Sequence, residues 1–232
     1  MANIAIVLSG GTGSRLGADV PKQYISVGGK PIISYCLQTF VDCETVDSIV
    51  IVLAEEWKQF VNEQIKSFNT KKKIFYADSG ETRQCSVYNG LKKVKEMGFT
   101  SDDIVIVHDA ARPLCSKNLI NRCLEACIDA DGAMPAINVK DTLYVSEDGI
   151  HIKALLNRSQ LRAGQAPEAF RFRKYMKAHE EMKHEDLMKI NGSTEIAFKA
   201  GLNCVIVEGD PINIKITTPE DLINFGSIIN NV

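Results

Sequence analysis

The sequence predicts an α/β protein with a doubly wound, Rossmann-like fold, in which helices cover both faces of a mostly parallel mixed sheet. Two observations support this prediction. Short apolar runs typical of buried parallel strands alternate along the chain with segments of helical periodicity. Between about residues 138 and 165 this alternation gives way to short β-like runs around the turn at 147–149, which indicates a protruding β-arm. No repeat or low-complexity linker interrupts the chain, so residues 1–232 are expected to form one domain.

The predicted elements follow one another in regular order. The apolar run 4–8 predicts a strand, and the helical spacing of apolar residues in 34–40 closes a first β-loop-α unit. The runs 47–53, 74–76, 103–108 and 203–207 predict further strands, and a helix is expected at about 55–68, with Trp57 in packing rather than chemistry. Further helices are predicted at about 117–129 and 173–188. A last helix begins after Thr218, where Pro219 and the acids Glu220 and Asp221 form a helix-start signal.

Charge and composition exclude several classes of protein. The 27 Lys and Arg residues against 29 Asp and Glu residues give a net charge of −2, so no overall field attracts nucleic acid or an anionic membrane. The seven cysteines are odd in number, scattered and without a C-x-x-C pair, which fits a reducing cytoplasm better than a disulfide framework or a zinc site. No signal-peptide pattern is present, and no apolar stretch approaches the roughly 20 residues of a membrane span. We therefore expect a cytoplasmic protein that binds neither nucleic acid nor membrane.

The first predicted strand leads into a glycine-rich loop that predicts a phosphate site. Backbone N–H groups in such a loop can approach phosphate oxygens directly, and Arg15 and Lys22 can neutralise a triphosphate. The spacing fits neither the P-loop, which needs Lys-Ser/Thr after its last glycine, nor the dinucleotide fingerprint. A glycine turn with solvated charges is the structural alternative. The nucleotide-binding residues predicted in this loop are Ser9, Gly10, Gly11, Thr12 and Gly13.

Two later segments place polar groups at the ends of predicted elements. Arg83 and Ser86 lie in a polar loop at the entrance of a helix, and helix N-termini bind anions and hydroxyls. Asp109 follows the strand 103–108, and the carboxyl ends of parallel strands are where α/β proteins place metal ligands or catalytic groups. A helix N-cap or turn is the alternative role for Asp109.

Together these pieces resemble the cytidylyltransferases that activate polyol phosphates, a family with 2-C-methyl-D-erythritol 4-phosphate and ribitol-5-phosphate members. The resemblance spans nearly the whole chain and is specific because its motifs occur together and in order. It rests on the glycine-rich loop with Arg15 and Pro-Lys-Gln-Tyr at 21–24, on the segments 80–87 and 107–113, on Asp141-Thr142, and on the segment 213–222.

The resemblance implies that the phosphate of a polyol phosphate attacks the α-phosphorus of CTP and that pyrophosphate leaves, with Mg²⁺ or another divalent cation bridging phosphate oxygens. It implies that Arg15, Lys22 and Lys215 stabilise the developing charge and that Asp109 holds the Mg²⁺ or orients the polyol. It further implies a homodimer in which the arm reaches across to the other subunit, so that Arg158 serves the partner's site. The remaining implied contacts are Gly80, Glu81, Arg83 and Ser86 with CTP, and Arg112, Thr142 and Arg158 with the polyol phosphate.

The sequence departs from this family where the second substrate is expected to bind. Gln165-Ala166-Pro167-Glu168 stands where relatives usually carry Gln-Thr-Pro-Gln, so a hydroxyl expected to touch the substrate phosphate is absent. The segment 190–195 (Ile-Asn-Gly-Ser-Thr-Glu) stands where relatives usually carry Thr-Asp-Asp or Thr-Asp-Ala. The nucleotide half is therefore expected to be intact and the acceptor half altered.

Several functions stay open at this point. The segment 108–112 and Ser86-Val87 favour the methylerythritol enzyme, which implies isoprenoid precursor synthesis, whereas Gly164-Gln165 and Glu56-Trp57 favour the ribitol enzyme of cell-wall or capsule synthesis. We prefer the methylerythritol enzyme. A non-catalytic nucleotide-binding regulator that has lost the acceptor site is an alternative from another class, and a sugar-1-phosphate nucleotidyltransferase using another base is a third.

Overall fold

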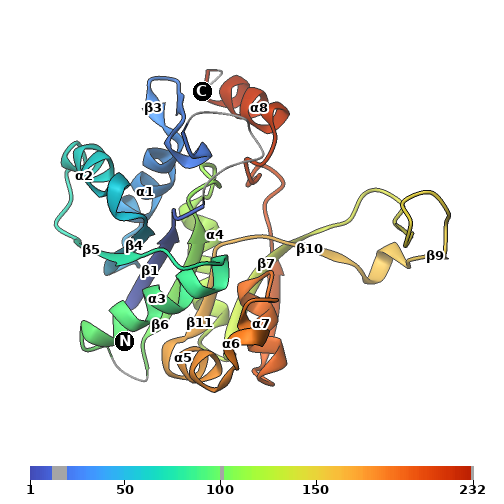
Figure 1. The fold of residues 1–232 in the computed structure, drawn as a ribbon. Coiled ribbons are helices and arrows are strands. Elements are labelled where there is room, and N and C mark those ends of the chain that lie inside the picture. Colours follow the sequence, from blue (N-terminus) through green and yellow to red (C-terminus); the bar gives the residue numbers. More distant parts are fainter. Residues whose placement is uncertain (12–19, 100–101, 231–232) are drawn as a thin grey trace.

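The protein is described by a computed structural model that covers residues 1–11, 20–99 and 102–230 (Figure 1). Its centre is an eight-stranded sheet with the order β10-β7-β11-β6-β1-β4-β5, in which β12 also pairs with β7. Strands β5, β4, β1 and β6 are parallel neighbours, whereas β11 runs antiparallel to both β6 and β7. The strands are β1 (Asn3–Leu8), β4 (Ser48–Leu53), β5 (Lys73–Asp78), β6 (Ile104–Asp109), β7 (Gly132–Asn138), β10 (Arg162–Gly164), β11 (Glu168–Arg171) and β12 (Cys204–Glu208).

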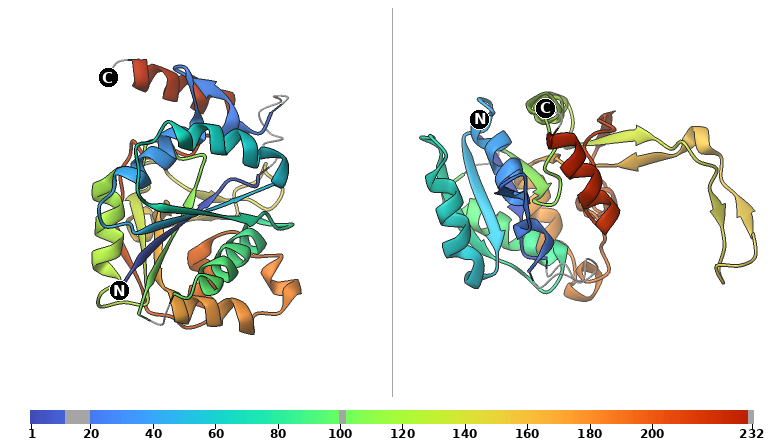
Figure 2. Two further views of the ribbon diagram at one scale, coloured as in Figure 1. Left: turned by 90° about the vertical axis from the view of Figure 1, so that its left-hand side faces the viewer. Right: turned by 90° about the horizontal axis from the view of Figure 1, so that it is seen from above.

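Helices cover both faces of this sheet (Figures 1 and 2). Side chains of β1 alternate between two apolar clusters: Ala5 and Val7 pack with α1, α2 and α4, whereas Ile4 and Ile6 pack with α3, α5 and α7. This two-sided burial explains why the inner strands are continuous apolar runs. The helices are α1 (Ile32–Asp42), α2 (Lys58–Lys66), α3 (Arg83–Glu96), α4 (Lys117–Ala126), α5 (Phe172–Glu181), α6 (His184–Leu187), α7 (Ser193–Lys199) and α8 (Pro219–Asn230), with 3-10 turns η2 (Lys22–Tyr24), η3 (Glu55–Trp57) and η4 (Arg158–Gln160).

A hairpin forms the predicted arm. Its base is the antiparallel pairing of β10 with β7, in which Arg162 lies opposite Asn138, and its distal part pairs β8 (Tyr144–Val145) with β9 (Ala154–Leu155). Between β8 and β9 the Asp148 carboxylate accepts hydrogen bonds from the backbone N–H groups of Ile150 and His151. Figure 1 and the right-hand view of Figure 2 show this segment extending well away from the sheet and its helices. The doubly wound α/β fold with a protruding arm is therefore confirmed.

The structure differs from the predicted elements at one helix, and it contains β7, β11 and α7, which were not predicted. The helix predicted at about 173–188 is two helices, because the backbone is extended at Met182 and Lys183. This break turns the chain so that Leu187 and Ile190 bury their side chains in the same apolar cluster as α5. The helix-start signal at Thr218 is confirmed, since the Asp221 carboxylate accepts from the N–H groups of Thr217 and Thr218. None of the helices in the described part of the chain has the length and apolarity that crossing a bilayer requires.

Three loops that carry predicted site residues meet at one edge of the sheet. The register places Leu8 beside both Val52 of β4 and Asp109 of β6, so these strands end together. Just beyond the strands, the Ser9 N–H donates to Val52 O at 2.7 Å, and the Ser79 N–H donates to Leu53 O at 3.0 Å. The loops after β1, β5 and β6 are thereby brought side by side.

Candidate active site

A cavity of about 560 Å³ lies where these loops meet. It is bordered by the first part of the glycine loop, the loop before α3, the end of β6 and the segment before α8. The predicted site residues that line this cavity are Gly10, Gly11, Lys22, Gly80, Glu81, Arg83, Ser86, Asp109 and Lys215. Residues from positions 10 to 215 of the chain thus form one site, as expected of the carboxyl edge of a parallel sheet. Thr12, Gly13 and Arg15 lie outside the described residues.

The start of the glycine loop is held by η2. Gln23 donates from Nε2 to the carbonyl oxygens of Ser9 and Gly11, at 2.7 and 2.8 Å. The hydroxyl of Tyr24 donates to Ser9 O and accepts from Ser9 Oγ. Trp57 stacks on Tyr24 with ring centroids 4.2 Å apart, which confirms its packing role. These contacts place Lys22 beside the loop, and its side chain lines the cavity.

Two glycines allow the neighbouring loops to approach closely. A side chain at Gly10 would put its Cβ 2.3 Å from Cβ of Ser79, and one at Gly80 would put its Cβ 2.5 Å from Cβ of Cys85. The Ser86 hydroxyl completes the turn, since it accepts from the Gly80 N–H and donates to the carbonyl of Thr82. This side of the cavity is thus built from backbone and short polar groups, which suit recognition of a base and ribose edge.

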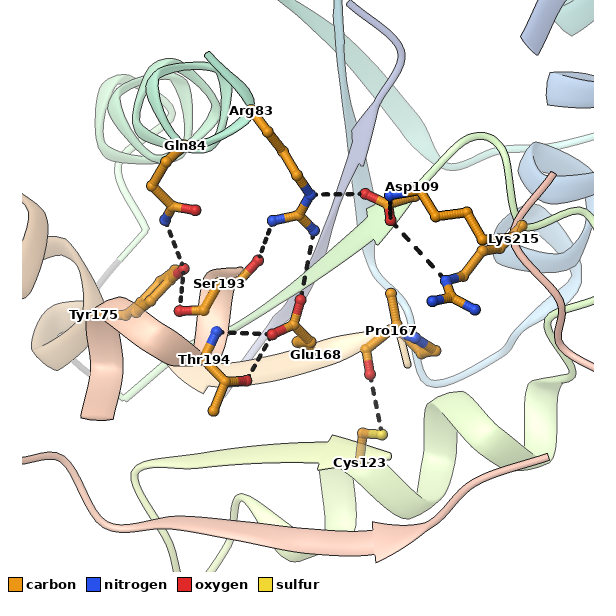
Figure 3. A network of polar contacts seen from close by, with 12 residues as sticks. Arg83, Gln84, Asp109, Cys123, Pro167, Glu168, Tyr175, Ser193, Thr194 and Lys215 are labelled. Carbon is orange, nitrogen blue, oxygen red and sulfur yellow. Dashed lines mark hydrogen bonds and ion pairs between the residues drawn. The ribbon is translucent and has the colours of Figure 1, made fainter. Parts of the chain in front are cut away.

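Asp109 lies at the centre of a cluster of cations (Figure 3). Its Oδ1 accepts from Arg83 Nε at 2.9 Å, its Oδ2 accepts from Lys215 Nζ at 2.8 Å, and Arg112 Nε lies 4.0 Å from Oδ2. Burial alone would raise the pKa of this carboxyl, but the charges of Arg83 and Lys215 hold it well below its usual range. Asp109 is therefore ionised at neutral pH. Because its carboxylate pairs with cations, an N-cap role does not describe it.

The Arg83 guanidinium contacts three other side chains of the protein. Besides Asp109, it donates from Nη1 to Ser193 Oγ at 2.8 Å, and its Nη2 lies 3.4 Å from Glu168 Oε1. Burial opposes its charge, but Asp109 and Glu168 together raise its pKa above the usual value. The sequence predicted a CTP contact for Arg83, and that stays a prediction. The ion pair with Asp109 was not predicted, because no local pattern connects the two residues.

Arg112 is held beneath the cavity by the segment before α8. Its Nη1 donates to Asn213 O at 2.7 Å, and the Asn213 side chain donates from Nδ2 to Ala166 O at 2.7 Å. His108 is fully buried, which lowers its pKa to about 4, so its ring is neutral and Nε2 can donate to Arg112 O. The sequence indicates Asn213 only as part of the motif at 213–222, whereas in the structure it joins Arg112 to Ala166.

Thr142 and Arg158 are not brought to this cavity within one chain. Both are exposed residues of the arm, and Arg158 Nη1 donates to Lys140 O at 2.6 Å. Arg158 lines a separate cavity of about 510 Å³ at the base of the arm, together with Arg162, Asn157 and other polar groups. If these residues act in catalysis, they therefore require an approach by another subunit.

The donor set at Asp109 limits how a metal could bind. Within residues 1–11, 20–99 and 102–230, no three His, Cys, Asp or Glu side chains gather as a metal site. Asp109 is a single carboxylate whose two oxygens already accept from Arg83 and Lys215. Mg²⁺ keeps several waters and takes one or two carboxylates together with substrate phosphates. The site therefore fits a magnesium ion that enters with a nucleotide, and not one held by the chain alone.

Comparison with known proteins gives a consistent result. The family model described as 2-C-methyl-D-erythritol 4-phosphate cytidylyltransferase matches residues 3–231. The 2-C-methyl-D-erythritol 4-phosphate cytidylyltransferase of Clostridium botulinum (strain Eklund 17B / Type B) is 36% identical over 226 residues, covering 97% of this chain and 98% of the relative. The ribitol-5-phosphate cytidylyltransferase of Vibrio parahaemolyticus serotype O3:K6 is 32% identical over 229 residues, covering 98% and 96%.

A solved structure extends the similarity to three dimensions. The crystal structure of 2-C-methyl-D-erythritol 4-phosphate cytidylyltransferase from Francisella tularensis has a TM-score of 0.81 and 30% identity, covering 97% of this chain and 100% of that one. The family match, the two sequence relatives and this fold agree with the motifs that line the cavity. The chain therefore belongs to the 2-C-methyl-D-erythritol 4-phosphate cytidylyltransferase family of nucleotidyltransferases.

Proposed function

We propose that this protein transfers the cytidylyl group of CTP to 2-C-methyl-D-erythritol 4-phosphate and releases pyrophosphate, as a step of isoprenoid precursor synthesis. The observation that carries the proposal is the cluster of Asp109 with Arg83, Arg112 and Lys215 beside the glycine loop. A net excess of positive charge at one end of a cavity suits two phosphate-bearing substrates. The names of the family model and of most of the similar proteins support this acceptor.

The reaction requires mainly that the chain positions the two substrates and supplies positive charge. The attacking phosphate oxygen of the acceptor is already anionic at neutral pH, so no side chain has to remove a proton from it. The charge that builds on the α-phosphate and the pyrophosphate needs cations at the cavity, and Lys22 and Lys215 line it. We infer that Arg15 adds a third such cation. The ion pair with Asp109 keeps Lys215 Nζ at the cavity before substrate arrives.

We propose that Mg²⁺, or another divalent cation, enters this site with CTP. Asp109 is the residue of this chain that would hold it, and the bound ion would screen the phosphate charges as they approach each other. Isothermal titration of CTP with and without Mg²⁺ tests this idea in the wild-type protein and in an Asp109→Asn variant. An equal Mg²⁺ effect in both proteins would exclude Asp109 as a ligand.

Ribitol 5-phosphate is the alternative acceptor. Ala166, which stands where threonine is expected, has no hydroxyl to offer a substrate phosphate, and its side chain is buried. The ribitol-5-phosphate enzyme of Vibrio parahaemolyticus is nearly as similar as the methylerythritol relatives. A pyrophosphate-release assay with CTP, Mg²⁺ and each acceptor at matched concentration decides between them. A higher kcat/KM for ribitol 5-phosphate would overturn our choice of acceptor, and silence with a broad panel of polyol phosphates would favour a non-catalytic regulator.

We propose that the protein is cytoplasmic and that it forms a homodimer, for which the arm is the supporting feature. The arm exposes several large apolar side chains, Tyr144, Ile150, Ile152 and Leu155 among them, which a lone chain would leave in water. A second copy that covers them would also bring Arg158 toward the other subunit's cavity. Light scattering coupled to size exclusion should give twice the mass of one chain. Leu155→Asp should lower that mass and the turnover together, whereas a monomeric wild-type protein would contradict the dimer.

A further inference from the structure

Two segments in which this sequence departs from its family meet in space. Glu168, at the start of β11, accepts on Oε2 from both the N–H and the hydroxyl of Thr194, at 2.8 and 2.6 Å. Glu168 Oε1 faces Arg83 Nη2, and Ser193 accepts from Arg83 Nη1. Figure 3 shows these side chains converging on Arg83 from β11 and α7. The two departures therefore form one structural unit.

This unit lies behind the cavity and acts through Arg83. Glu168 is 6% exposed and Ser193 is fully buried, and neither residue lines the cavity. Arg83 does line it, and its three donor groups point in three directions, to Asp109, Ser193 and Glu168. A planar guanidinium bound on all sides has a fixed orientation. The contacts behind the cavity thereby determine where Arg83 meets Asp109.

The hydrogen-bond pattern at Glu168 requires a carboxylate. Both of its oxygens accept, one from Arg83 and the other from Thr194. A glutamine has one acceptor oxygen and one amide donor, so in either orientation a donor would face the Arg83 guanidinium or the Thr194 N–H. The negative charge beside Arg83 is thus supplied here by Glu168.

The negative charge of Glu168 also affects how strongly the Asp109 carboxylate pairs with Arg83 and with Lys215. Arg83 pairs with two carboxylates, those of Asp109 and Glu168. The Asp109 carboxylate in turn pairs with two cations, Arg83 and Lys215. Without the Glu168 charge, Arg83 would have Asp109 as its one ionic partner in this cluster, and it would draw the carboxylate away from Lys215. The position of Lys215 at the cavity therefore depends on Glu168.

We propose that Glu168 is a positioning residue for the transfer reaction. Thr194 supports Glu168, and Glu168 and Ser193 together hold Arg83. Arg83 in turn holds Asp109 in its pairing with Lys215. The role in turnover rests on the cytidylyltransferase function proposed above. The role in positioning Arg83 does not, and can be measured separately.

The test compares a variant that keeps shape with one that keeps charge. Glu168→Gln preserves the length and volume of the side chain, and Glu168→Asp preserves its charge. We expect Glu168→Gln to lower kcat/KM for the acceptor roughly a hundredfold, as misplacement of reacting groups does. The KM for CTP should change less than kcat, because the displaced Lys215 acts on charge that builds in the transition state. Glu168→Asp should retain clearly more activity than Glu168→Gln. A purely steric role predicts the opposite order.

The matched control is Glu180→Gln. Glu180 forms an ion pair with Lys95 at 2.8 Å, near the opposite end of α3 from Arg83, and both partners are solvent-exposed. This variant should have wild-type kinetics. Equal losses in Glu168→Gln and Glu180→Gln would mean that removing any carboxylate that pairs with a cation of α3 has this effect, and would overturn the proposal.

Crystal structures provide the readout that does not depend on activity. In Glu168→Gln, Arg83 should lose its present orientation and the contact between Lys215 Nζ and Asp109 Oδ2 should lengthen. In Glu180→Gln both should be unchanged. If the wild-type protein turned over no polyol phosphate, the proposed function would fail while this structural comparison still decided the positioning role. A Glu168→Gln structure with Arg83, Asp109 and Lys215 unmoved would overturn it.

Discussion

Replacing Asp109 by asparagine should destabilise the protein and at the same time increase its affinity for polyphosphate. The cluster contains three cations, Arg83, Arg112 and Lys215, and two carboxylates, Asp109 and Glu168, which leave a net charge of +1. Asp109→Asn changes this to a net charge of +2 with little change in shape. Arg83 keeps Glu168 as a partner. The side chain of Arg112 is only 13% exposed and its partial burial lowers its pKa, so it loses an ionic neighbour where water cannot compensate fully.

The magnitude follows from the burial of each partner. Breaking a buried ion pair costs about 3–5 kcal/mol. The side chain of Lys215 is 36% exposed and can turn to water, so we expect the loss here to be smaller, about 2–3 kcal/mol. For a chain of this size that loss corresponds to a decrease in Tm of about 4–12 °C. Turnover should fall about a hundredfold or more, because Lys215 is no longer held at the cavity.

The decisive assay is thermal unfolding with inorganic pyrophosphate in EDTA, which removes any metal effect. Pyrophosphate should raise the Tm of Asp109→Asn by more than it raises that of the wild-type protein, because the uncompensated cations bind the anion more tightly and binding stabilises the folded state. Asp221→Asn serves as the matched control, since its carboxylate caps α8 and pairs with no cation among the residues that the structure describes. An Asp109→Asn protein as stable as wild type, or one with a smaller pyrophosphate shift, would refute this account of the cluster.

Three further predictions concern other parts of the site and the core. Lys22→Ala should lower kcat/KM about a hundredfold while changing the free energy of unfolding by less than about 1 kcal/mol, since the residue begins the short turn η2 and its side chain lines the cavity. Kinetics and urea unfolding of the same preparation test this, and a mainly unfolded variant would contradict it. Gly10→Ala should weaken CTP binding measured by calorimetry, because its Cβ would meet Ser79 at 2.3 Å and the strain should cost about 1–3 kcal/mol. The free energy of unfolding should decrease as the pH falls from about 6.5 to about 4, because burial lowers the pKa of His108 and His179 to about 4 in the folded protein while the unfolded chain binds protons at about 6.5. Urea titrations across this range test the sign, and a constant free energy between pH 7 and pH 5 would contradict the burial of these rings.

The local elements could be predicted because their patterns are local. The strands at 4–8, 47–53 and 103–108 are runs of buried apolar residues, and their ends agree with the structure within about one residue. The arm could be predicted because the period of the pattern changes near residue 138. The single helix predicted at about 173–188 was wrong, since the break at Met182 and Lys183 depends on burying Leu187 and Ile190 against helices distant in sequence.

The sequence by itself therefore determined the fold class, the strands β1, β4, β5, β6 and β12 of the sheet, and the loops that carry Lys22, Asp109 and Lys215. These follow from periodicity, from glycine placement and from the rule that parallel strands end at a common edge. Only the tertiary structure decided the partners of Arg83. Its contacts with Asp109, Glu168 and Ser193 span 26, 85 and 110 residues of sequence. Ion pairing depends on distance and burial, and a single sequence specifies neither until packing of the sheet and helices brings these side chains together.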